Sequence, residues 1–351
     1  MSKKNILFIS PVKYDALKQR HQGITIELAK RGYFVYYINP LCSNGFSCKI
    51  NKNSTNLKII DIKIPFKATS YPFLQNILVT IAFKLLKKKL HLNENKIILW
   101  IADPSWAKIA EYKWAKIIYD CCDLHGNFPN QISKIWQYYE QKIATVANLI
   151  TISHPYLKEH FTLEQKKKSL LVPNATFFKK LQIPILNNEI INNNKIKLLS
   201  SGAHYEWVDI DWLKMLTTID NVELHIAGTG RGKYFKELIA IKNVIFHGKL
   251  NSTKLFELMK DCQIGLIPFK DIELIKGVDP IKAYDYASAG LDIWAPDIEA
   301  LHPNKMINFF IKDINDAKMS IKTFKRREKK LSNIIVPSWS DRVEFLLQYL
   351  Q

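Results

Sequence analysis

Short apolar runs alternate with longer amphipathic segments along most of the chain. In the amphipathic segments the apolar positions recur every three or four residues, and this alternation is typical of parallel sheets built from strand–helix–strand units. In the first half the pattern predicts strands at Asn5–Ser10, Phe34–Ile38, Ile59–Ile64, Ile97–Ala102, Ile117–Asp120, Leu149–Ile152 and Leu170–Val172. It predicts helices there at Gln19–Arg31, Pro72–Leu90 and Ser133–Val146.

A second series of the same kind follows a stretch rich in asparagine and proline. Its predicted strands are Lys197–Ser201, Val222–Ala227, Val244–His247, Ile264–Pro268 and Asp292–Trp294. Its predicted helices are Ile210–Thr218, Thr253–Asp261, Pro280–Ala289 and, at the end of the chain, Ser338–Leu350. Two sheets suit a chain of 351 residues, because single hydrophobic cores stop growing at roughly 250 to 300 residues.

We therefore expect an α/β protein with two doubly wound, Rossmann-like domains that face each other across a cleft. The predicted boundaries are 1–175 for the first domain, 176–194 for a linker, 195–337 for the second domain and 338–351 for a helix that crosses back to the first. Ligands of open parallel sheets bind beyond the carboxyl ends of the strands. The functional site is expected in the cleft.

The positive charge is concentrated in the first half of the chain. The formal charge is +19, and residues 1–178 contain 26 basic and 11 acidic side chains, against 25 and 21 in residues 179–351. An anionic partner for the first domain explains this asymmetry. Nucleic acid is not expected, because the sequence has no RNP, zinc-finger or helix-turn-helix signature.

Cysteine usage and hydropathy point to the cytoplasm. The chain has five cysteines, an odd number, and Met1 leads directly into a strand-like run, so we expect a reducing compartment. The longest uncharged stretch, Ala68–Phe83, is 16 residues long, shorter than the roughly 20 residues of a spanning helix. Adjacent Cys121 and Cys122 lack the C-x2-C spacing of zinc ligands. No metal site is expected.

The segment Tyr71–Leu90 combines an apolar pattern with a basic end. Its last turns carry Lys84, Lys87, Lys88 and Lys89. Such a helix suits the surface of an anionic membrane, where each lysine contributes about 1 kcal/mol. The alternative is a core helix whose basic end interacts with its own dipole. We favour peripheral association with the inner face of the cytoplasmic membrane.

The region around Asp279 has the features of an anion site at the start of a helix. A buried strand ends at Pro268, and Asp279 and Pro280 read as the N-cap and first position of a helix. The free N–H groups there, with Lys282 in the first turn, suit a phosphate. Asp285, one turn later, is placed to accept hydrogen bonds from vicinal hydroxyls. The alternative is an ordinary capped helix with a solvated lysine.

The residues P-I-K-A-Y-D-Y-A-S-A-G at 280–290 resemble the P-x-K-x-Y-E-Y-x-A-x-G segment of GT-B fold glycosyltransferases of family 4 and their teichuronic-acid-type relatives. Asp285 stands where that family has the glutamate that binds the donor ribose. The VPN at Val172–Asn174 resembles the interdomain I-P-N-G, with Ala175 replacing the glycine. The ending Ser338, Trp339 and Arg342 resembles the S-W-x-x-R tail that crosses back to the first domain in that fold.

This sequence departs from the family pattern at two places. Eight residues before Asp285 stands Gly277 instead of a second glutamate, and the segment after the first strand of the second domain lacks the arginine and lysine that clamp the donor diphosphate. His204, Arg231 and Lys282 are the substitutes. The nucleotide-sugar site implied by the resemblance contains Gly202, His204, Gly228, Arg231, Lys249, Asp279, Lys282, Tyr284 and Asp285.

Polar residues that follow strands of the first domain are candidates for catalysis and acceptor binding. Asp123 and His125 follow one strand, and either can take a proton from an acceptor hydroxyl. We favour Asp123, and we expect nearby lysine and arginine to disfavour protonated His125. The alternative is a buried cysteine pair behind an N-capping aspartate. The acceptor candidates are Lys13, Arg20, His21 and Asp103, each of which is alternatively a cap or a surface residue.

The resemblance implies a metal-independent glycosyltransferase that moves a sugar from a nucleotide-diphosphate donor to a lipid-linked or anionic glycan of the bacterial envelope, as in capsule and related polysaccharides. No further cofactor is expected. The alternatives are a nucleotide-sugar epimerase of the same fold and a degenerate protein that binds nucleotide sugars without turnover. The separate basic domain argues against the epimerase. The missing glutamate, arginine and lysine keep the inactive protein as an alternative.

Overall fold

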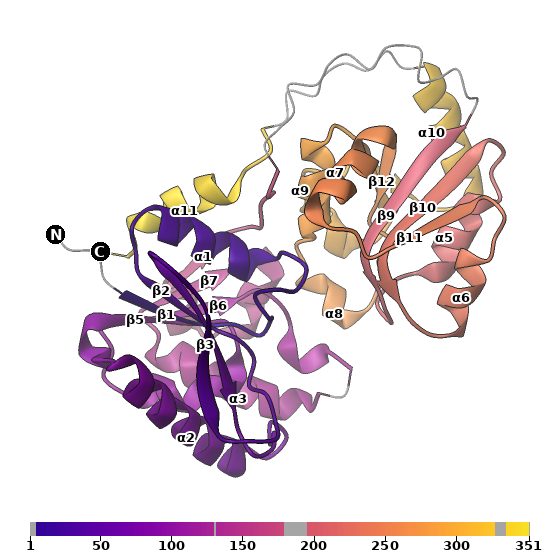
Figure 1. The fold of residues 1–351 in the computed structure, drawn as a ribbon. Helices are drawn as coiled ribbons and strands as arrows, with labels where there is room; N and C mark the ends of the chain where they lie inside the picture. Colours follow the sequence, from indigo (N-terminus) through magenta and orange to yellow (C-terminus); the bar gives the residue numbers. More distant parts are fainter. Residues whose placement is uncertain (1–4, 130, 179–194, 327–334, 351) are drawn as a thin grey trace. The chain divides into compact units, whose positions relative to one another are not determined.

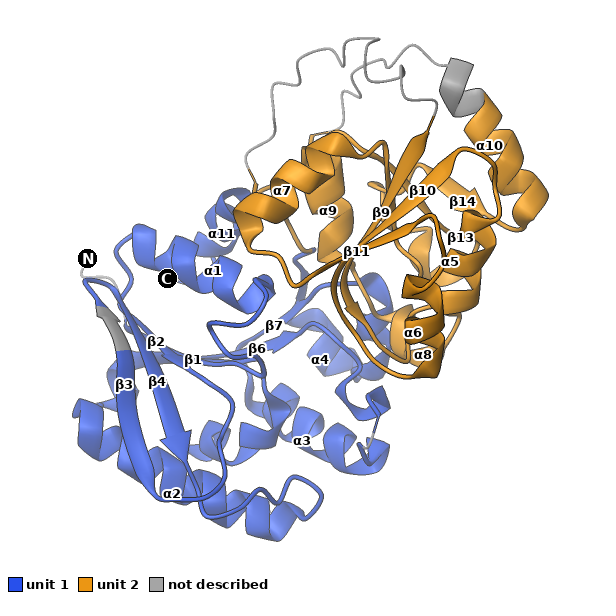
Figure 2. Ribbon diagram, turned by 45° about the vertical axis from the view of Figure 1, so that its right-hand side comes forward, with its two compact units in different colours: residues 1–173, 339–351 blue, residues 174–338 orange. Residues whose placement is uncertain are grey.

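The computed structural model describes residues 5–129, 131–178, 195–326 and 335–350. The chain divides into two compact units, coloured separately in Figure 2: unit 1 contains residues 1–173 and 339–351, and unit 2 contains residues 174–338. Residues 174–178, most of which the sequence assigned to a linker, belong to unit 2. The rest of the expected linker, 179–194, lies outside the described residues.

Unit 1 is built on an eight-stranded sheet (Figure 1). Its strands are β1 (Asn5–Ile9), β2 (Val35–Ile38), β3 (Ser47–Ser54), β4 (Leu57–Lys63), β5 (Ile97–Ile101), β6 (Lys116–Cys121), β7 (Leu149–Ile152) and β8 (Ser169–Leu171). They lie in the order β3-β4-β2-β1-β5-β6-β7-β8, and the neighbours are parallel except β3, which is antiparallel to β4. The seven predicted strands are confirmed, and the edge strand β3 was not predicted.

Helices cover both faces of this sheet. The α-helices of unit 1 are α1 (Arg20–Lys30), α2 (Pro72–Leu90), α3 (Ser133–Val146), α4 (Leu163–Lys167) and α11 (Trp339–Leu347). Both views show α1 and α11 on one face and α2 and α3 on the other (Figures 1 and 2). A buried aromatic row crosses the middle strands, where the ring of Phe8 lies 5.8 Å from Tyr37 and 5.6 Å from Trp100.

The helix α2 is largely a core element. Its inward face buries Leu78, Val79, Ala82, Phe83 and Leu86, so most of the apolar pattern read as a membrane face packs inside unit 1. The side chains that remain exposed are apolar residues at its start and lysines near its end. Within the described residues, no helix has the length and apolar character that crossing a membrane requires.

Unit 2 is a second doubly wound domain, with an all-parallel sheet. Its strands are β9 (Ile196–His204), β10 (Val222–Gly230), β11 (Val244–Gly248), β12 (Ile264–Leu266), β13 (Asp292–Pro296) and β14 (Phe309–Ile311), in the order β11-β10-β9-β12-β13-β14. Its helices are α5 (Ile210–Thr217), α6 (Lys233–Ile239), α7 (Ser252–Asp261), α8 (Glu273–Lys276), α9 (Ile281–Ser288) and α10 (Ile314–Arg326). All the strands and helices predicted here are present. The sequence pattern missed α6, α8, α10 and β14.

Each sheet has a topological switch point, a pair of neighbouring strands whose following connections lead to opposite sides of the sheet. In unit 1 this point lies between β1 and β5, and in unit 2 between β9 and β12. The loops that follow two such strands separate and leave a crevice beyond their carboxyl ends, where open α/β sheets bind ligands. The loops after β1, β5 and β6 and those after β9, β10 and β12 are therefore the places to look for chemistry.

Candidate functional site

In unit 2 the second turn of α9 is fastened to β9. The Tyr286 hydroxyl lies 2.8 Å from the backbone nitrogen of Ser201 and 2.9 Å from its Oγ. The Tyr286 ring packs on Gly265 in β12, where a Cβ would fall 2.3 Å from the ring. Only glycine at this position lets the helix approach so closely. The second turn of α9 is thereby held against β9 and β12.

Lys282 lies in the first turn of α9, four residues before Tyr286 and so on the same face of the helix. Its Nζ is 4.9 Å from the centre of the Phe269 ring, in the loop after β12. Burial lowers the pKa of Lys282 to about 8, which still leaves the ammonium mostly charged at pH 7. A poorly solvated ammonium gains more from an anionic ligand than a solvated one does.

The neighbouring His204 supports the strand ends and is not a free ligand. Its Nε2 lies 2.8 Å from Ser200 Oγ and its Nδ1 lies 3.3 Å from the carbonyl of Thr229. Burial, together with the charge of Lys282, lowers the pKa of His204 to about 4. The imidazole is therefore neutral, with Nδ1 donating to Thr229 and Nε2 accepting from Ser200.

Two glycines remove side chains from the ends of β9 and β10. Gly202 and Gly228 are paired in register, with φ values of +109° and +128°. A Cβ on Gly228 would fall 1.9 Å from the carbonyl oxygen of Gly202, whereas a Cβ on Gly202 would meet nothing within 4 Å. The backbone here is exposed to a ligand on the Gly202 side.

The two other predicted basic ligands lie further out. Arg231 pairs with Glu206 at 2.6 Å and stacks 4.7 Å above the Tyr205 ring. Tyr205 reaches the site through a 3.3 Å contact with Thr229 Oγ1. Lys249 is exposed and follows β11, which β10 separates from β9. Of the predicted donor residues, the fold thus gathers Gly202, His204, Gly228 and Lys282 and leaves Lys249 apart.

Asp279 is not the N-cap that the sequence predicted. Pro280 occupies the N-cap, without a side-chain capping bond, and the helix begins at Ile281. The Asp279 carboxylate instead accepts hydrogen bonds from the backbone N–H of Asn174 at 2.6 Å, from the Tyr284 hydroxyl at 2.9 Å and from Asn304 Nδ2 at 2.8 Å. The predicted ligands Asp279 and Tyr284 therefore use these groups to hold the first residues of unit 2.

Asp285 lies one turn beyond Lys282 and is only partly exposed. Its Oδ1 accepts hydrogen bonds from the Thr176 hydroxyl at 2.7 Å and from the Phe177 N–H at 3.4 Å. Burial raises the pKa of Asp285 to about 7, although these two hydrogen bonds oppose the shift. Among the described residues, no hydrogen bond reaches the other carboxylate oxygen, Oδ2.

In unit 1 three predicted residues gather at the carboxyl ends of β5 and β6. Asp103 follows β5 and caps a 3-10 turn by accepting from Ser105 N–H at 3.0 Å. Asp123 and His125 follow β6, and His125 Nδ1 lies 3.2 Å from Glu140 Oε1 on α3. Burial raises the pKa of Asp123 and of Asp103, although the charge of His125 opposes both shifts. We call Asp103, Asp123 and His125 the acidic cluster.

The surroundings of His125 are the reverse of the expected ones. Burial lowers its pKa, but the hydrogen bond and charge of Glu140, followed by the charges of Asp123 and Asp103, outweigh burial and raise it. The prediction that lysine and arginine surround His125 is wrong, because three carboxylates face it. A raised pKa favours the protonated imidazole, which cannot accept a proton.

Arg20 and His21, which the sequence offered as acceptor contacts or alternatively as caps or surface residues, are interior residues. Arg20 is 2% exposed and forms a buried ion pair with Asp120, with Nη2 2.8 Å from Oδ1 and Nη1 2.6 Å from the Val172 carbonyl. His21 is equally buried, and its Nε2 lies 3.6 Å from Cys122 Sγ. Burial lowers the pKa of His21 to about 4. Both start α1, whose inward face places them under the sheet edge.

Three residues that act on the acidic cluster or on Lys282 were not predicted from the sequence. Glu140 and Lys67 act on the acidic cluster, and Phe269 packs on Lys282. Glu140 lies 15 residues beyond His125 on the far side of a turn, so no local spacing indicates the pair. Among the described residues, no group of three or more histidine, cysteine or carboxylate side chains could hold a metal ion.

No protein-family model matches the chain. Solved structures resemble it over nearly its whole length: the sucrose-phosphate synthase of Thermosynechococcus elongatus has a TM-score of 0.66 and 12% identity, covering 99% of this chain and 96% of that chain. An E. coli structure named for trehalose-6-phosphate and bound with UDP-2-fluoro glucose has a TM-score of 0.65 and 10% identity, covering 98% of this chain and 95% of that chain. The apo lipopolysaccharide outer core galactosyltransferase WaaB has a TM-score of 0.59 and 14% identity, covering 93% of this chain and 91% of that chain. The chain has the GT-B fold of two Rossmann-like domains.

A particular relative appears at the level of sequence. The chain is similar to TuaH of Bacillus subtilis (strain 168), a protein provisionally named as a teichuronic acid biosynthesis glycosyltransferase, with 25% identity over 221 residues. The match covers 56% of this chain and 55% of TuaH. It therefore spans only about half the length of that curated relative.

Proposed function

We propose that the protein is a glycosyltransferase, in which unit 2 binds a nucleotide-diphosphate sugar and unit 1 binds the acceptor. The observation that carries this is the placement of the partly desolvated Lys282 beside the open glycine edge of β9, at the point where the GT-B sheet reverses. A diphosphate matches that combination, because ammonium and free backbone N–H groups both favour phosphate oxygens.

The donor would lie along the ends of β9 and β12. Lys282 would neutralise the leaving diphosphate, and Asp285 would accept a hydrogen bond from the donor ribose through its remaining oxygen. Preorganised charge of this kind acts most strongly where negative charge develops in the transition state. The scheme uses only side chains of this protein and the donor.

In unit 1 the acidic cluster would serve the acceptor. Asp123 would take the proton from the attacking hydroxyl, since its raised pKa makes it a stronger base than an ordinary aspartate. His125, paired with Glu140, would hold Asp123 in place by its charge. We propose a lipid-linked or anionic glycan of the bacterial envelope as the acceptor, in line with the name of the TuaH relative.

Ligand-dependent stability tests the proposal. Nucleoside diphosphates and their sugars should raise the melting temperature of the full chain, because a ligand at 100 times its dissociation constant stabilises by about 2.7 kcal/mol. Nucleosides alone should have a smaller effect. Purified protein that binds these donors should also hydrolyse one slowly and transfer its sugar to an acceptor. Binding without any turnover would favour the inactive alternative, and no binding at all would refute the proposal.

We further propose that unit 1 contacts an anionic membrane peripherally through residues 71–90, with the apolar side chains at the start of α2 and the lysines near its end. The exposed apolar side chains in and just before this segment are Phe66, Tyr71, Phe73, Leu74 and Ile77, of which Phe73 is 77% exposed. From residue 62 to residue 93 the sequence has six lysines and no aspartate or glutamate. Exposed aromatics beside a lysine-rich segment suit the headgroup region of an anionic leaflet.

Sedimentation with vesicles tests the membrane proposal. Replacing Lys87, Lys88 and Lys89 with glutamine should reduce binding to vesicles of anionic lipid and make the remaining binding less dependent on salt. The double variant Phe73→Ser/Leu74→Ser should reduce binding at every salt concentration. Leu163→Ser, at an equally exposed leucine on α4, is the matched control. Wild-type binding by all three variants would show that α2 is a core helix only.

A further inference from the structure

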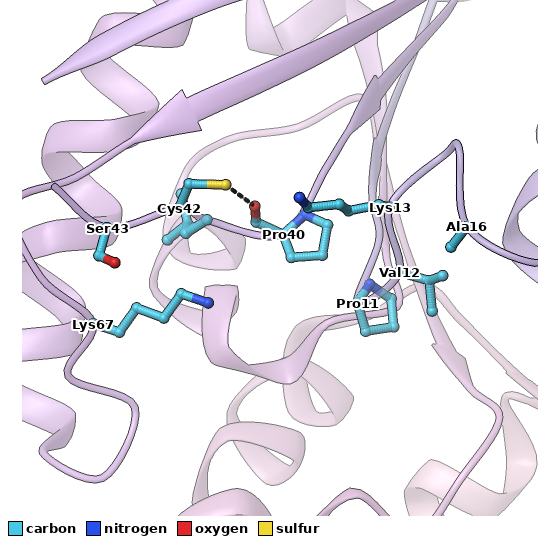
Figure 3. Close-up of a pocket in the computed structure, with 9 residues that line it drawn as sticks. Pro11, Val12, Lys13, Ala16, Pro40, Cys42, Ser43 and Lys67 are labelled. Carbon is cyan, nitrogen blue, oxygen red and sulfur yellow. Dashed lines mark hydrogen bonds between the residues drawn. The ribbon is translucent and has the colours of Figure 1, made fainter. Parts of the chain in front are cut away.

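A pocket opens in unit 1 beyond the ends of β1 and β2, outside the acidic cluster. Its volume is about 520 Å³, within the range of small-molecule sites. The lining residues come from the loops after β1 and β2 and from the segment before α2: Pro11, Val12, Lys13, Ala16, Pro40, Leu41, Cys42, Ser43 and Lys67. Figure 3 shows how they surround the space.

The charge of this pocket is entirely positive. Lys13 and Lys67 are both exposed, and their side chains enter the space from different segments (Figure 3). No acidic residue lines the pocket. In the part of the chain that the structure describes, neither ammonium has a carboxylate within ion-pair distance. Two ammonium groups at one concave surface attract an anion and are not neutralised by the protein itself.

The walls of the pocket are held in place by internal hydrogen bonds. The loop after β1 is fixed by Tyr37, whose hydroxyl donates to the Val12 carbonyl at 2.8 Å and lies 2.7 Å from Ser10 Oγ. The loop after β2 is tied to β4, because Cys42 N–H donates to the Ile62 carbonyl at 3.0 Å. A site with fixed walls loses little conformational entropy when a ligand binds.

The pocket is also close to the acidic cluster. The charge of Lys67 is one of those that act on Asp103, opposing the rise that burial causes in the pKa of that carboxyl. Lys67 therefore lines the pocket and also acts electrostatically on one member of the acidic cluster. An anion seated against Lys67 would bind on the side of unit 1 that acts on the acidic cluster.

We propose that this pocket binds a phosphate group carried by the acceptor, held between Lys13 and Lys67. The proposal rests on the proposed function, because it names the chemical class of acceptor that unit 1 takes. Phosphate presents several oxygens to two separate ammonium groups, and the pocket is large enough for a phosphorylated sugar. Soluble sugar phosphates and lipid phosphates both carry such a group, and the experiment below separates the two sources.

Two probes are used with the full chain. The soluble arm is titration with glucose 6-phosphate, with glucose as its uncharged reference. The lipid arm is sedimentation with phosphatidylcholine vesicles containing a few per cent of a long-chain polyprenyl phosphate, against phosphatidylcholine alone. The variant is Lys13→Gln/Lys67→Gln. The matched control is Lys96→Gln/Lys113→Gln, which removes the same charge from two exposed lysines that precede β5 and β6 at the opposite edge of the sheet.

We expect one arm to show binding that the pocket variant weakens and the control does not. Each lost ammonium–phosphate contact should reduce affinity by about tenfold. The arm that responds identifies the source of the phosphate. The proposal is overturned if neither probe binds, or if the pocket variant and the control bind both probes equally.

Binding of a nucleoside diphosphate, measured by thermal shift, distinguishes the two proposals. It should be the same in the pocket variant as in the wild type, because unit 2 holds the donor site. Nucleoside diphosphate binding without a lysine-dependent phosphate probe would refute the pocket and leave the transferase standing. Lysine-dependent phosphate binding without donor binding or turnover would refute the transferase and leave an anion site in unit 1.

Discussion

The indole ring of Trp339 lies directly on the backbone of Gly23. A Cβ at Gly23 would fall 2.4 Å from Cδ2 of the ring, which is closer than Cβ atoms come to neighbouring side chains. The contact joins the last helix, α11, to α1 across residues far apart in the sequence. Arg31 adds hydrogen bonds of 3.0 and 2.9 Å to the carbonyl and hydroxyl of Ser340. The start of α11 is thus held to unit 1 by shape and by polar contacts together.

The first prediction concerns this contact. Gly23→Ala should destabilise the protein, because overpacking costs about 1–3 kcal/mol and exceeds the gain of about 1 kcal/mol from helix propensity. In a Trp339→Ala background the same substitution should stabilise, since only the propensity gain remains. Urea unfolding of the four proteins measures both effects. The same sign in both backgrounds would contradict the contact.

The second prediction compares two glycines at the same edge of unit 2. Gly228→Ala should destabilise by more than 2 kcal/mol, because the new Cβ meets the Gly202 carbonyl as well as an unfavourable φ. Gly202→Ala should cost only about 1–2 kcal/mol, since its Cβ has open space and only the backbone is strained. Urea denaturation gives the comparison. Equal losses would show that the two strand ends are not as close as described.

The third prediction concerns the donor diphosphate. Lys282→Ala should weaken the binding of a nucleoside diphosphate by about tenfold or more, as loss of a charge-assisted hydrogen bond implies, and leave nucleoside binding nearly unchanged. Lys242→Ala, at an exposed lysine before β11, is the control. Calorimetric titration of the nucleoside diphosphate and the nucleoside into the wild type and both variants measures these affinities. If Lys282→Ala reduces both ligands equally, or neither, Lys282 does not contact the diphosphate.

The fourth prediction follows from the raised pKa of Asp285. Because the pKa is about 7 in the folded protein and about 3.9 in an unfolded chain, the folded state binds the extra proton between these values. Stability should therefore fall as pH rises from about 4 to 7. Asp285→Asn keeps an acceptor for Thr176 but removes the titration, so its stability should change less between pH 5 and pH 8. An unchanged pH profile by urea unfolding would exclude this group.

The fifth prediction separates the roles of Asp123 and His125. Asp123→Asn should abolish transfer while donor binding persists. The wild-type protein should transfer the sugar with inversion of its anomeric configuration. Glu140→Gln should lower the pKa of His125, because the hydrogen bond and charge that raise it are weakened, and NMR titration of the imidazole measures this shift. An active Asp123→Asn protein, or a product with retained configuration, would refute Asp123 as the base.

Most of the fold was predictable from hydrophobic periodicity, and the exceptions have physical causes. The missed edge strand β3 has the sequence SCKINKNS, whose lysines and asparagines suit an edge that must not pair with other chains, so it lacks the apolar run of an inner strand. By contrast, α10 was detectable: Asp313 caps it, and Ala317 and Ile321 are buried one turn apart.

The candidate site was predictable where one local segment determines it. Lys282 and Asp285 lie on one short helix, and Asp123 and His125 in one short loop, so spacing alone groups them. Arg20 and Asp279 were misplaced, because their partners Asp120 and Asn174 are about a hundred residues away in the sequence. A single sequence shows which residues carry charge but not which distant group neutralises it.

The division of the chain has a consequence for synthesis. Unit 1 receives both the first 173 residues and α11 near the end, whereas unit 2 is one continuous segment between them. During translation, the segment that emerges second is therefore the first to have all its residues outside the ribosome. The face of α1 around Gly23 stays uncovered until Trp339 has been synthesised, because the indole ring of Trp339 packs on it. A stalled or shortened product would thus present a complete unit 2 beside an unfinished unit 1, the form that chaperones and proteases act on.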